Sequence, residues 1–92
     1  MIESHARLDG NALAGPLSAV FAMDVTRALA QCDNCGRTGP IGETLVYGAP
    51  MGLVARCVGC GEALLRYAST PARTSLDLRG VAVLRFETPQ ET

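Results

Sequence analysis

The 92-residue sequence is poor in the side chains that most often carry catalysis or attract nucleic acid. It has no tryptophan and one histidine, His5, in a polar segment, and its serines form no recognisable pairing of a nucleophile with a base. All of the basic residues are arginine, but the net charge is -1, so no global positive field would draw the chain to nucleic acid or to an anionic membrane. We therefore expect a protein that is not an enzyme, with His5 solvated rather than catalytic or metal-bound.

Long apolar runs are also missing. The most apolar stretch, residues 8–23, is too short and too broken to span a bilayer, and it does not follow the basic start of a signal peptide. We expect a cytoplasmic protein with no membrane association. A chain of 92 residues has room for one core, so we expect a single domain over residues 1–92 with flexible ends at 1–7 and 87–92. The abundance of arginine, alanine and glycine is typical of a GC-rich bacterial genome.

The chain does contain four cysteines, and they fall in two matched motifs. These are Cys32-Asp33-Asn34-Cys35-Gly36 and Cys57-Val58-Gly59-Cys60-Gly61. A C-x-x-C spacing lets one tight turn present two thiolates to the same ion, and the glycine that follows permits the positive φ that the turn requires. Two such turns brought together make a tetrahedral four-sulfur site typical of structural zinc. The sequence therefore predicts a zinc ribbon with a metal site at Cys32, Cys35, Cys57 and Cys60.

Other uses of the four cysteines are less favoured. Disulfides need an oxidising compartment, for which the sequence gives no export signal. A dithiol redox centre would need a C-x-x-C motif that opens a helix, whereas both motifs precede strand-like sequence. Iron remains the alternative, because the same four thiolates would make a rubredoxin-like electron carrier. Rubredoxins have an aromatic-rich core, whereas this chain has only Phe21, Tyr47, Tyr67 and Phe86, so we favour zinc.

A thiol-based redox or metal sensor is the other functional use of such a metal site. Arg37 and Arg56 lie next to the two motifs in sequence, and a neighbouring positive charge makes a thiolate more reactive. Against catalysis, a site of four sulfurs leaves no coordination position open for a substrate or a metal-bound water. We therefore favour a structural metal in a non-enzymatic binding module.

The N-terminal part of the chain is predicted to be helical. Asp9 can cap a first turn, and one helix face collects apolar residues at Leu13, Leu17, Val20 and Phe21. Gly15-Pro16 interrupts this pattern, because proline is tolerated at the first position of a helix but not in its interior. We expect a short helical turn over residues 10–14 and a new helix from Pro16 to about Met23.

The remainder predicts strands separated by turn residues. Gly39-Pro40 is expected to be a turn, and a hairpin turn at residues 48–52 leads to a strand that runs directly into the second cysteine motif. The predicted strands cover residues 24–31, 43–47, 53–57, 62–69, 73–79 and 81–86. The fold class that follows is α+β, mainly β: a small antiparallel sheet of zinc-ribbon type, with the N-terminal helix covering one face.

Three segments together carry a resemblance to a known family. They are the run Leu8-Asp9-Gly10-Asn11-Ala12-Leu13-Ala14-Gly15, the two C-x-x-C-G motifs, and the closing Leu76-Asp77-Leu78-Arg79-Gly80. From about Leu8 to Phe86 the chain resembles a family of small bacterial proteins of zinc-ribbon type that is known only as a domain of unknown function. The resemblance implies a metal site at the four cysteines and implies no activity.

The partner is predicted to be a protein or a nucleic acid, and the sequence leaves the oligomeric state open. Four arginines are spread over the later strands, at Arg66, Arg73, Arg79 and Arg85. Three or more on one face could bind phosphates. Because the net charge is close to zero, we favour the alternative in which they pair with acidic residues across the sheet, namely Glu62, Asp77 and Glu87.

Overall fold

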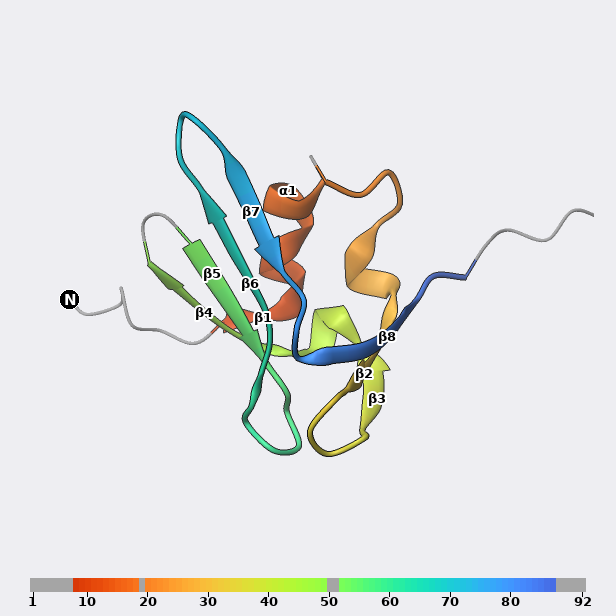
Figure 1. Ribbon diagram of the computed structural model, residues 1–92. Helices are drawn as coiled ribbons and strands as arrows, with labels where there is room; N and C mark the ends of the chain where they lie inside the picture. The colour runs from red at the N-terminus through yellow and green to blue at the C-terminus, as the bar shows by residue number, and fades with distance from the viewer. Residues whose placement is uncertain (1–7, 19, 50–51, 88–92) are drawn as a thin grey trace, which may run out of the picture.

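The strands form two antiparallel sheets (Figure 1). The protein is described by a computed structural model over residues 8–18, 20–49 and 52–87. The larger sheet has the strand order β1-β4-β5-β6-β7, with β1 Leu8–Asp9, β4 Leu45–Ala49, β5 Gly52–Arg56, β6 Ala63–Ser69 and β7 Thr74–Asp77. The smaller sheet has the order β3-β2-β8, with β2 Leu29–Cys32, β3 Thr38–Pro40 and β8 Val81–Arg85.

The mainly-β α+β class is confirmed, but the expectation of one small sheet is wrong because the strands divide between two. The described residues contain one short α-helix and no helix long and apolar enough to cross a membrane. Of the ends predicted to be flexible, 1–7 and 87–92, all but Glu87 lie outside the described residues, as does His5.

The N-terminal segment differs from the predicted pair of helices. Leu8–Asp9 is a strand that pairs with β4, the 3₁₀ helix η2 spans Gly10–Leu13, and α1 spans only Ala14–Leu17. The predicted cap is confirmed, since the carboxylate of Asp9 accepts a hydrogen bond from the Asn11 N–H at 3.0 Å. The predicted helix from Pro16 to Met23 is wrong: the Ser18 hydroxyl donates to the Gly15 carbonyl at 2.7 Å, an interaction that competes with helix continuation.

The strand predicted over residues 24–31 is present only in its second half. Its first half is the 3₁₀ helix η3, Val25–Arg27. The carboxylate of Asp24 causes this, because it accepts hydrogen bonds from the N–H of Thr26 at 3.1 Å and from its hydroxyl at 2.7 Å. Such local bonding by aspartate favours a turn over a strand. Leu29–Cys32 then enters the first cysteine motif in extended form, as predicted.

The turn predicted at Gly39-Pro40 is wrong. Both residues belong to β3, a short edge strand that pairs with β2. Proline is tolerated there because an edge strand has one side without ladder partners. The chain turns instead in the 3₁₀ helix η4, Ile41–Glu43, whose Ile41 side chain is fully buried.

The predicted hairpin is present as β4 and β5, and two further hairpins extend the larger sheet. β4, β5, β6 and β7 pair in order, each with its successor, and the predicted break at residues 70–72 lies between β6 and β7. On β4 the faces alternate, since Val46 is fully buried while Tyr47 is exposed. The connection between β5 and β6 contains the second cysteine motif, and the connection between β2 and β3 contains the first.

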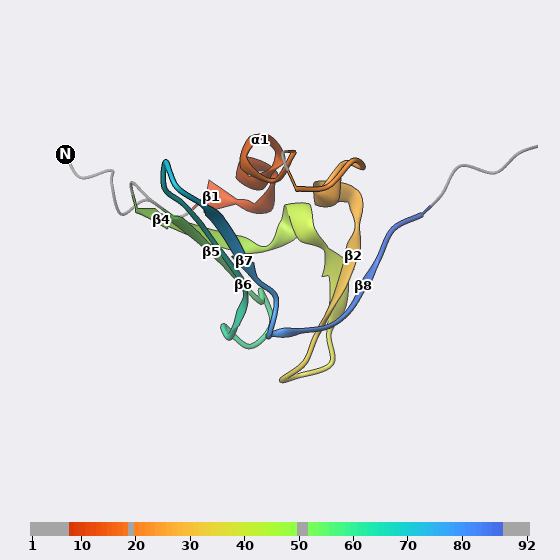
Figure 2. The same cartoon turned by 45° about the horizontal axis from the view of Figure 1, so that its top comes forward.

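The core lies between the two sheets and under the N-terminal helices (Figure 2). Its fully buried side chains come from η2, α1, η4, β4, β5 and β6, and the largest are Leu13, Leu17, Ile41, Val46 and Leu65. A second, smaller cluster consists of Cys32, Cys57 and Leu64, with Val81 packed against it. The two cysteine motifs therefore close the end of the molecule opposite α1, where both loops lie side by side (Figure 1).

Candidate metal centre

The two cysteine motifs adopt the same backbone conformation. In the first, the Gly36 N–H donates to the Cys32 carbonyl at 2.9 Å, and in the second, the Gly61 N–H donates to the Cys57 carbonyl at 2.9 Å. Gly36 and Gly61 both have φ at 82°, the left-handed conformation for which the sequence analysis required glycine. Each motif is thus a reverse turn, here called a knuckle: knuckle 1 is residues 32–36 and knuckle 2 is residues 57–61.

The structure brings all four cysteine sulfurs together. The Sγ atoms of Cys32, Cys35, Cys57 and Cys60 all lie within 4.8 Å of one another. Two distances join the knuckles directly: 3.7 Å between the sulfurs of Cys32 and Cys60, and 3.7 Å between those of Cys35 and Cys57. The first cysteine of each knuckle is buried and the second is exposed.

This cluster fits a tetrahedral metal ion. With metal–sulfur bonds of about 2.3 Å, the sulfurs of a regular tetrahedron lie about 3.8 Å apart, close to the two distances between the knuckles. Two cysteines from each hairpin supply the four thiolates, so the donor set is complete without any residue from elsewhere in the chain. Soft thiolate ligands in this geometry suit zinc or iron, and the positions of the sulfurs do not distinguish these metals.

Hydrogen bonds from neighbouring groups stabilise the thiolate form of two of the cysteines. The Asn34 side-chain amide, in knuckle 1, donates to the sulfur of Cys60 in knuckle 2 at 3.4 Å. With the backbone N–H of Glu62 it lowers the pKa of Cys60 to about 7 in the absence of a metal. For Cys35 the backbone N–H of Arg37 acts in the same direction, but desolvation and the other sulfurs outweigh it and raise its pKa to about 11.

Two arginines lie beside knuckle 2, as their positions in the sequence suggested. The Arg37 side chain reaches knuckle 2. A Cβ atom built on Gly59 would lie 3.0 Å from the Cδ atom of Arg37 and 3.7 Å from the sulfur of Cys57. Arg56 donates to the Gly61 carbonyl at 3.0 Å. Both side chains are exposed, so they place positive charge near a centre that carries excess negative charge when four thiolates bind a divalent ion.

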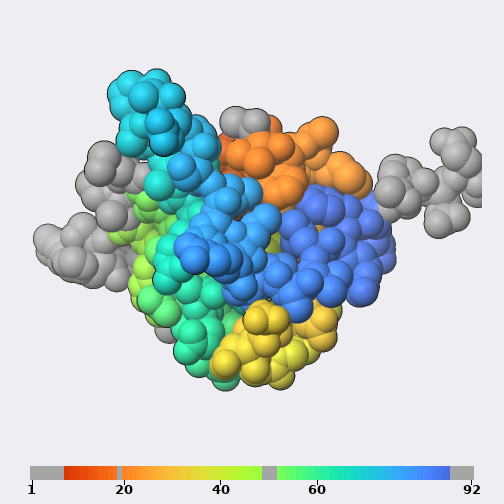
Figure 3. Space-filling model, in the orientation of Figure 1, coloured from red at the N-terminus to blue at the C-terminus, as the bar shows by residue number. Residues whose placement is uncertain are grey.

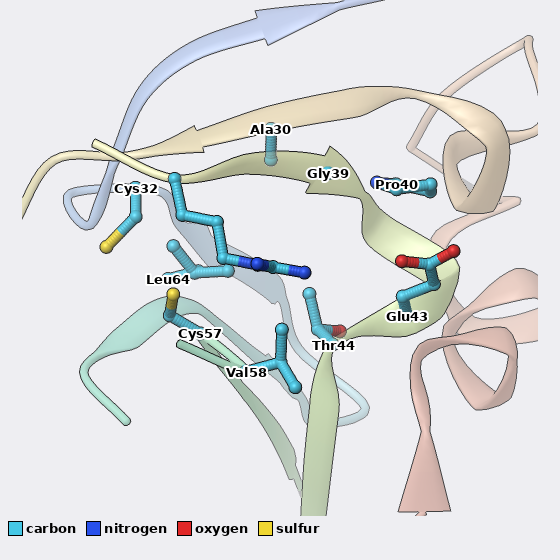
Figure 4. Close-up of a pocket in the computed structure, with 10 residues that line it drawn as sticks. Ala30, Cys32, Gly39, Pro40, Glu43, Thr44, Cys57, Val58 and Leu64 are labelled. Carbon is cyan, nitrogen blue, oxygen red and sulfur yellow. The ribbon is translucent and has the colours of Figure 1, made fainter. Parts of the chain in front are cut away.

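The cavity behind the sulfurs is too small for a substrate. It has a volume of about 20 Å³, enough for about one water molecule. Figure 4 shows Cys32 and Cys57 reaching it from different elements, β2 and the end of β5, with Leu64 beside them and Thr44 on the far wall. The buried side of the cluster therefore contacts packed protein and has no room for a reacting molecule.

The family assignment agrees with the resemblance noted from the sequence. The model of a family of unknown function, DUF6510, matches residues 3–89. The chain belongs to the DUF6510 family. No curated protein and no solved structure matches it.

The structure gives structural roles to the two other segments that carried the resemblance to DUF6510. In the first, Asp9 caps η2, and a Cβ atom on Gly10 would overlap the carbonyl oxygen of Ile41, so glycine allows η2 to pack against η4. In the last, a Cβ atom on Gly80 would overlap the carbonyl oxygen of Ala63. Both glycines are sites of close backbone approach.

Sequence reasoning missed Asn34 and Gly80 as parts of this centre. Gly80 donates its N–H to the Leu64 carbonyl at 3.2 Å and accepts from the Asp33 N–H at 2.9 Å, so it connects β6 to knuckle 1. The sequence indicated only that Asn34 lies inside a knuckle. That its side chain points toward Cys60 depends on how the two hairpins pack. For Gly80 the only signal was its place in the Leu76–Gly80 segment.

The four arginines of the later strands do not all lie on one face, although Arg66 and Arg73 share a face of the larger sheet. Arg85 lies in the smaller sheet opposite Leu29, whereas Arg66 lies in the larger sheet opposite Asp77. Arg79 forms an ion pair with Asp77 at 2.8 Å, but the two residues are neighbours in the same segment, so this pair is local and does not run across the sheet as predicted. The Arg79 hydrogen bonds hold the pKa of Asp77 at about 2.

Proposed function

We propose that this DUF6510 protein is a non-enzymatic zinc-binding protein in which one zinc ion, held by all four cysteines, joins its two sheets in a zinc-ribbon-like unit. The observation that carries the proposal is the convergence of four sulfurs from two matched knuckles to within 4.8 Å. Knuckle 1 belongs to the smaller sheet and knuckle 2 to the larger sheet. A metal held by both would cross-link the sheets at the end of the molecule opposite α1.

A structural role for the metal follows from the donor set. Four thiolates complete a tetrahedral site and leave no position for a substrate, and the cavity behind the sulfurs holds about 20 Å³. Metal binding to such a site contributes on the order of 10 kcal/mol to folding in small zinc peptides. A cross-link between two sheets stabilises a small chain of 92 residues more than a cross-link within one compact sheet would.

The partner that we favour is a protein rather than a nucleic acid. Beside the knuckles lies an open depression of about 490 Å³ with both acidic and basic walls, lined by Asp33, Asn34, Glu62, Ala63, Arg66, Arg79 and Gly80. Phosphate binding requires unpaired positive charge, whereas Arg79 is already paired with Asp77. Mixed charge of this kind is typical of the polar part of a protein interface. Salt-sensitive binding to single- or double-stranded nucleic acid would contradict this choice of partner.

The test is elemental analysis with a visible absorption spectrum, on protein purified without added metal. We expect one zinc per chain and no colour. Cys35→Ser should lower the zinc content, whereas the matched control Asp33→Ser, an exposed change in the same knuckle, should keep it. Folded protein without any metal would overturn the proposal.

The alternative is iron, with the protein as a rubredoxin-like electron carrier or a thiol-based sensor. The same four sulfurs would hold it, and Arg37 and Arg56 would make an oxidisable centre more reactive. Iron at one per chain, with the red colour of an iron–thiolate centre, would replace the zinc proposal by this one. Removing the metal with a chelator then tests its structural role. Under the zinc proposal, metal removal unfolds the region around both knuckles. NMR spectra would report this as a loss of amide signal dispersion.

A further inference from the structure

The outer edge of β7 is an unpaired strand edge. β7 stands last in the larger sheet and pairs only with β6 among the described strands. Thr74 and Ser75 are exposed on it, and the β6–β7 hairpin, cyan to blue in Figure 3, projects beyond the rest of the molecule. Its ladder with β6 has no register shift, so the edge carries neither a bulge nor a proline of the kind that prevents association.

The hydrogen bonds at the tip of this hairpin fix which backbone groups point outward. Thr70 and Arg73 exchange two backbone hydrogen bonds, at 2.8 and 3.3 Å. Because bonded and non-bonded pairs alternate in an antiparallel ladder, Ser75 and Asp77 are bonded to β6. The N–H and C=O groups of Thr74 and Leu76 therefore point away from the sheet. The contact of 3.2 Å between the hydroxyls of Ser69 and Thr74 agrees, since side chains lie closer in non-bonded pairs.

The side chains along this edge alternate between two faces. Arg73, Ser75 and Asp77 lie on the face that also bears Arg66 and Ala68 of β6, because Asp77 is opposite Arg66 and Ser75 is opposite Ala68. Leu76 lies on the other face and packs against the core. The solvent face of the edge thus presents a positive charge, a small hydroxyl and a negative charge at equal spacing.

We propose that the protein forms a homodimer in which β7 pairs antiparallel with β7 of a second copy, with the two-fold axis at Ser75. In this register Thr74 of each copy lies opposite Leu76 of the other, and each such pair exchanges two backbone hydrogen bonds. Arg73 of each copy lies opposite Asp77 of the other, whose carboxylate also accepts hydrogen bonds from Arg79 of its own copy, so each carboxylate is shared by two arginines and the interface has two charge pairs. The two larger sheets become one continuous sheet, and the contact is closed by its own symmetry.

Charge selects this register over the two neighbouring symmetric ones. An axis at Arg73 or at Asp77 would place two like charges opposite each other, which leaves Thr74, Ser75 and Leu76 as positions for the axis. An axis at Leu76 would place Arg73 opposite Arg79 of the second copy, two like charges. An axis at Thr74 would place Arg73 opposite Ser75 and Asp77 opposite Pro71, so this register forms no ion pair. The edge is therefore complementary to itself in one register.

The other described strand edges are less suited to self-pairing. β1 has two residues and β3 has three, so neither offers a ladder of useful length. β8 has five residues, but a self-pairing centred on Val83 would place Val81 opposite Arg85 and form no ion pair. The opposite charges flanking β7 thus distinguish it from the other edges.

The first test is sedimentation of the purified protein over a range of concentrations. We expect a monomer–dimer equilibrium. Arg73→Glu should weaken dimerisation about tenfold, because it replaces two attractive pairs by two repulsive ones. The matched control Arg85→Glu makes the same charge change on the smaller sheet and should leave dimerisation unchanged. A wild-type protein that stays monomeric up to about 1 mM would overturn the proposal, as would a dimer that Arg73→Glu does not weaken.

The register has its own test. Ser75→Cys places one thiol at the two-fold axis, in a non-bonded pair whose Cβ atoms are close enough for a disulfide. We expect mild oxidation of the metal-loaded protein to give a covalent dimer linked at this position, identified by peptide mass spectrometry. Ala68→Cys is the control, since this residue lies opposite Ser75 on the same face but one strand further from the edge. Equal cross-linking of both variants, or of neither, would overturn the proposed register.

Discussion

The backbone N–H of Asp33 donates to the carbonyl oxygen of Gly80 at 2.9 Å, which ties knuckle 1 to the segment that connects β7 and β8. Through its own N–H, Gly80 is also bonded to Leu64 of β6, the strand that follows knuckle 2. The relative position of the knuckles therefore depends on a backbone contact as well as on any bound metal. A change at Gly80 tests this dependence.

Replacing Gly80 by alanine should destabilise the protein by about 2 kcal/mol or more, because a Cβ atom there would overlap the backbone of Ala63 and would force the two segments apart. Urea unfolding of the metal-loaded protein measures the change. The control is Gly15→Ala, where a Cβ atom meets nothing within 4 Å and alanine favours the helix. Equal stability of the Gly80→Ala protein and the wild type would show that the contact is looser than described.

Replacing Gly36 or Gly61 by alanine should cost about 1–2 kcal/mol each, since both residues have φ at 82° and an L side chain is strained in that conformation. Space is not the cause, because a Cβ atom at either position meets nothing within 4 Å. Asparagine should therefore be tolerated better than alanine. Thermal unfolding at fixed metal content gives the order, and Gly39→Ala, in open space without a positive φ, should have little effect.

Replacing Asn34 by alanine should weaken metal binding about tenfold, because the Cys60 sulfur loses the hydrogen bond that its amide donates at 3.4 Å. Competition with a chromophoric chelator measures the affinity. Asp33→Ala changes the neighbouring exposed side chain and serves as the control. An unchanged affinity in Asn34→Ala, with the fold intact, would mean that the bond does not stabilise the thiolate.

The ion pair of Asp77 with Arg79 should appear in the pH dependence of Asp77. Its pKa of about 2 lies below the ordinary value of 3.8, so the pair stabilises the protein above about pH 4 and the contribution is lost as the pH falls toward 2. Carboxyl chemical shifts in NMR spectra at about pH 4 should show Asp77 still ionised in the wild type and about half protonated in Arg79→Ala.

The control for that titration is Arg85→Ala, which removes an arginine from the other sheet. It should leave the ionisation of Asp77 unchanged. Protonation of Asp77 near pH 4 in the wild type would show that the pair is not formed in solution. Metal content is measured in the same samples, because protonation of the thiolates at low pH releases the metal.

The hairpins and the knuckles were accessible from the sequence because local rules govern them. The turn residues at 70–72 separated β6 from β7, and the glycine after each C-x-x-C motif predicted the positive φ found at Gly36 and Gly61. The four ligand candidates could be named for the same reason, since the spacing of two cysteines in one turn is a local property.

Three secondary-structure predictions were wrong because they depend on contacts that the apolar periodicity of the sequence does not reveal. Asp24 bonds to Thr26 and forms a 3₁₀ helix where a strand was expected. Pro40 lies in β3 because that strand is at a sheet edge, where the missing N–H is tolerated. The helix α1 ends at Leu17 although Val20 and Phe21 fit its apolar pattern, and the Ser18 hydroxyl bonds back to the Gly15 carbonyl at that end.

The sequence by itself determined the two knuckles, the four cysteines that they bring together and the mainly-β class. Each of these depends on residues close together in the chain. Only the tertiary structure decided that the strands divide into two sheets, that each sheet contributes one knuckle, and that Asn34 and Gly80 complete the centre. Those features depend on which hairpin packs against which, and the free energy of that packing comes from contacts between residues far apart in sequence.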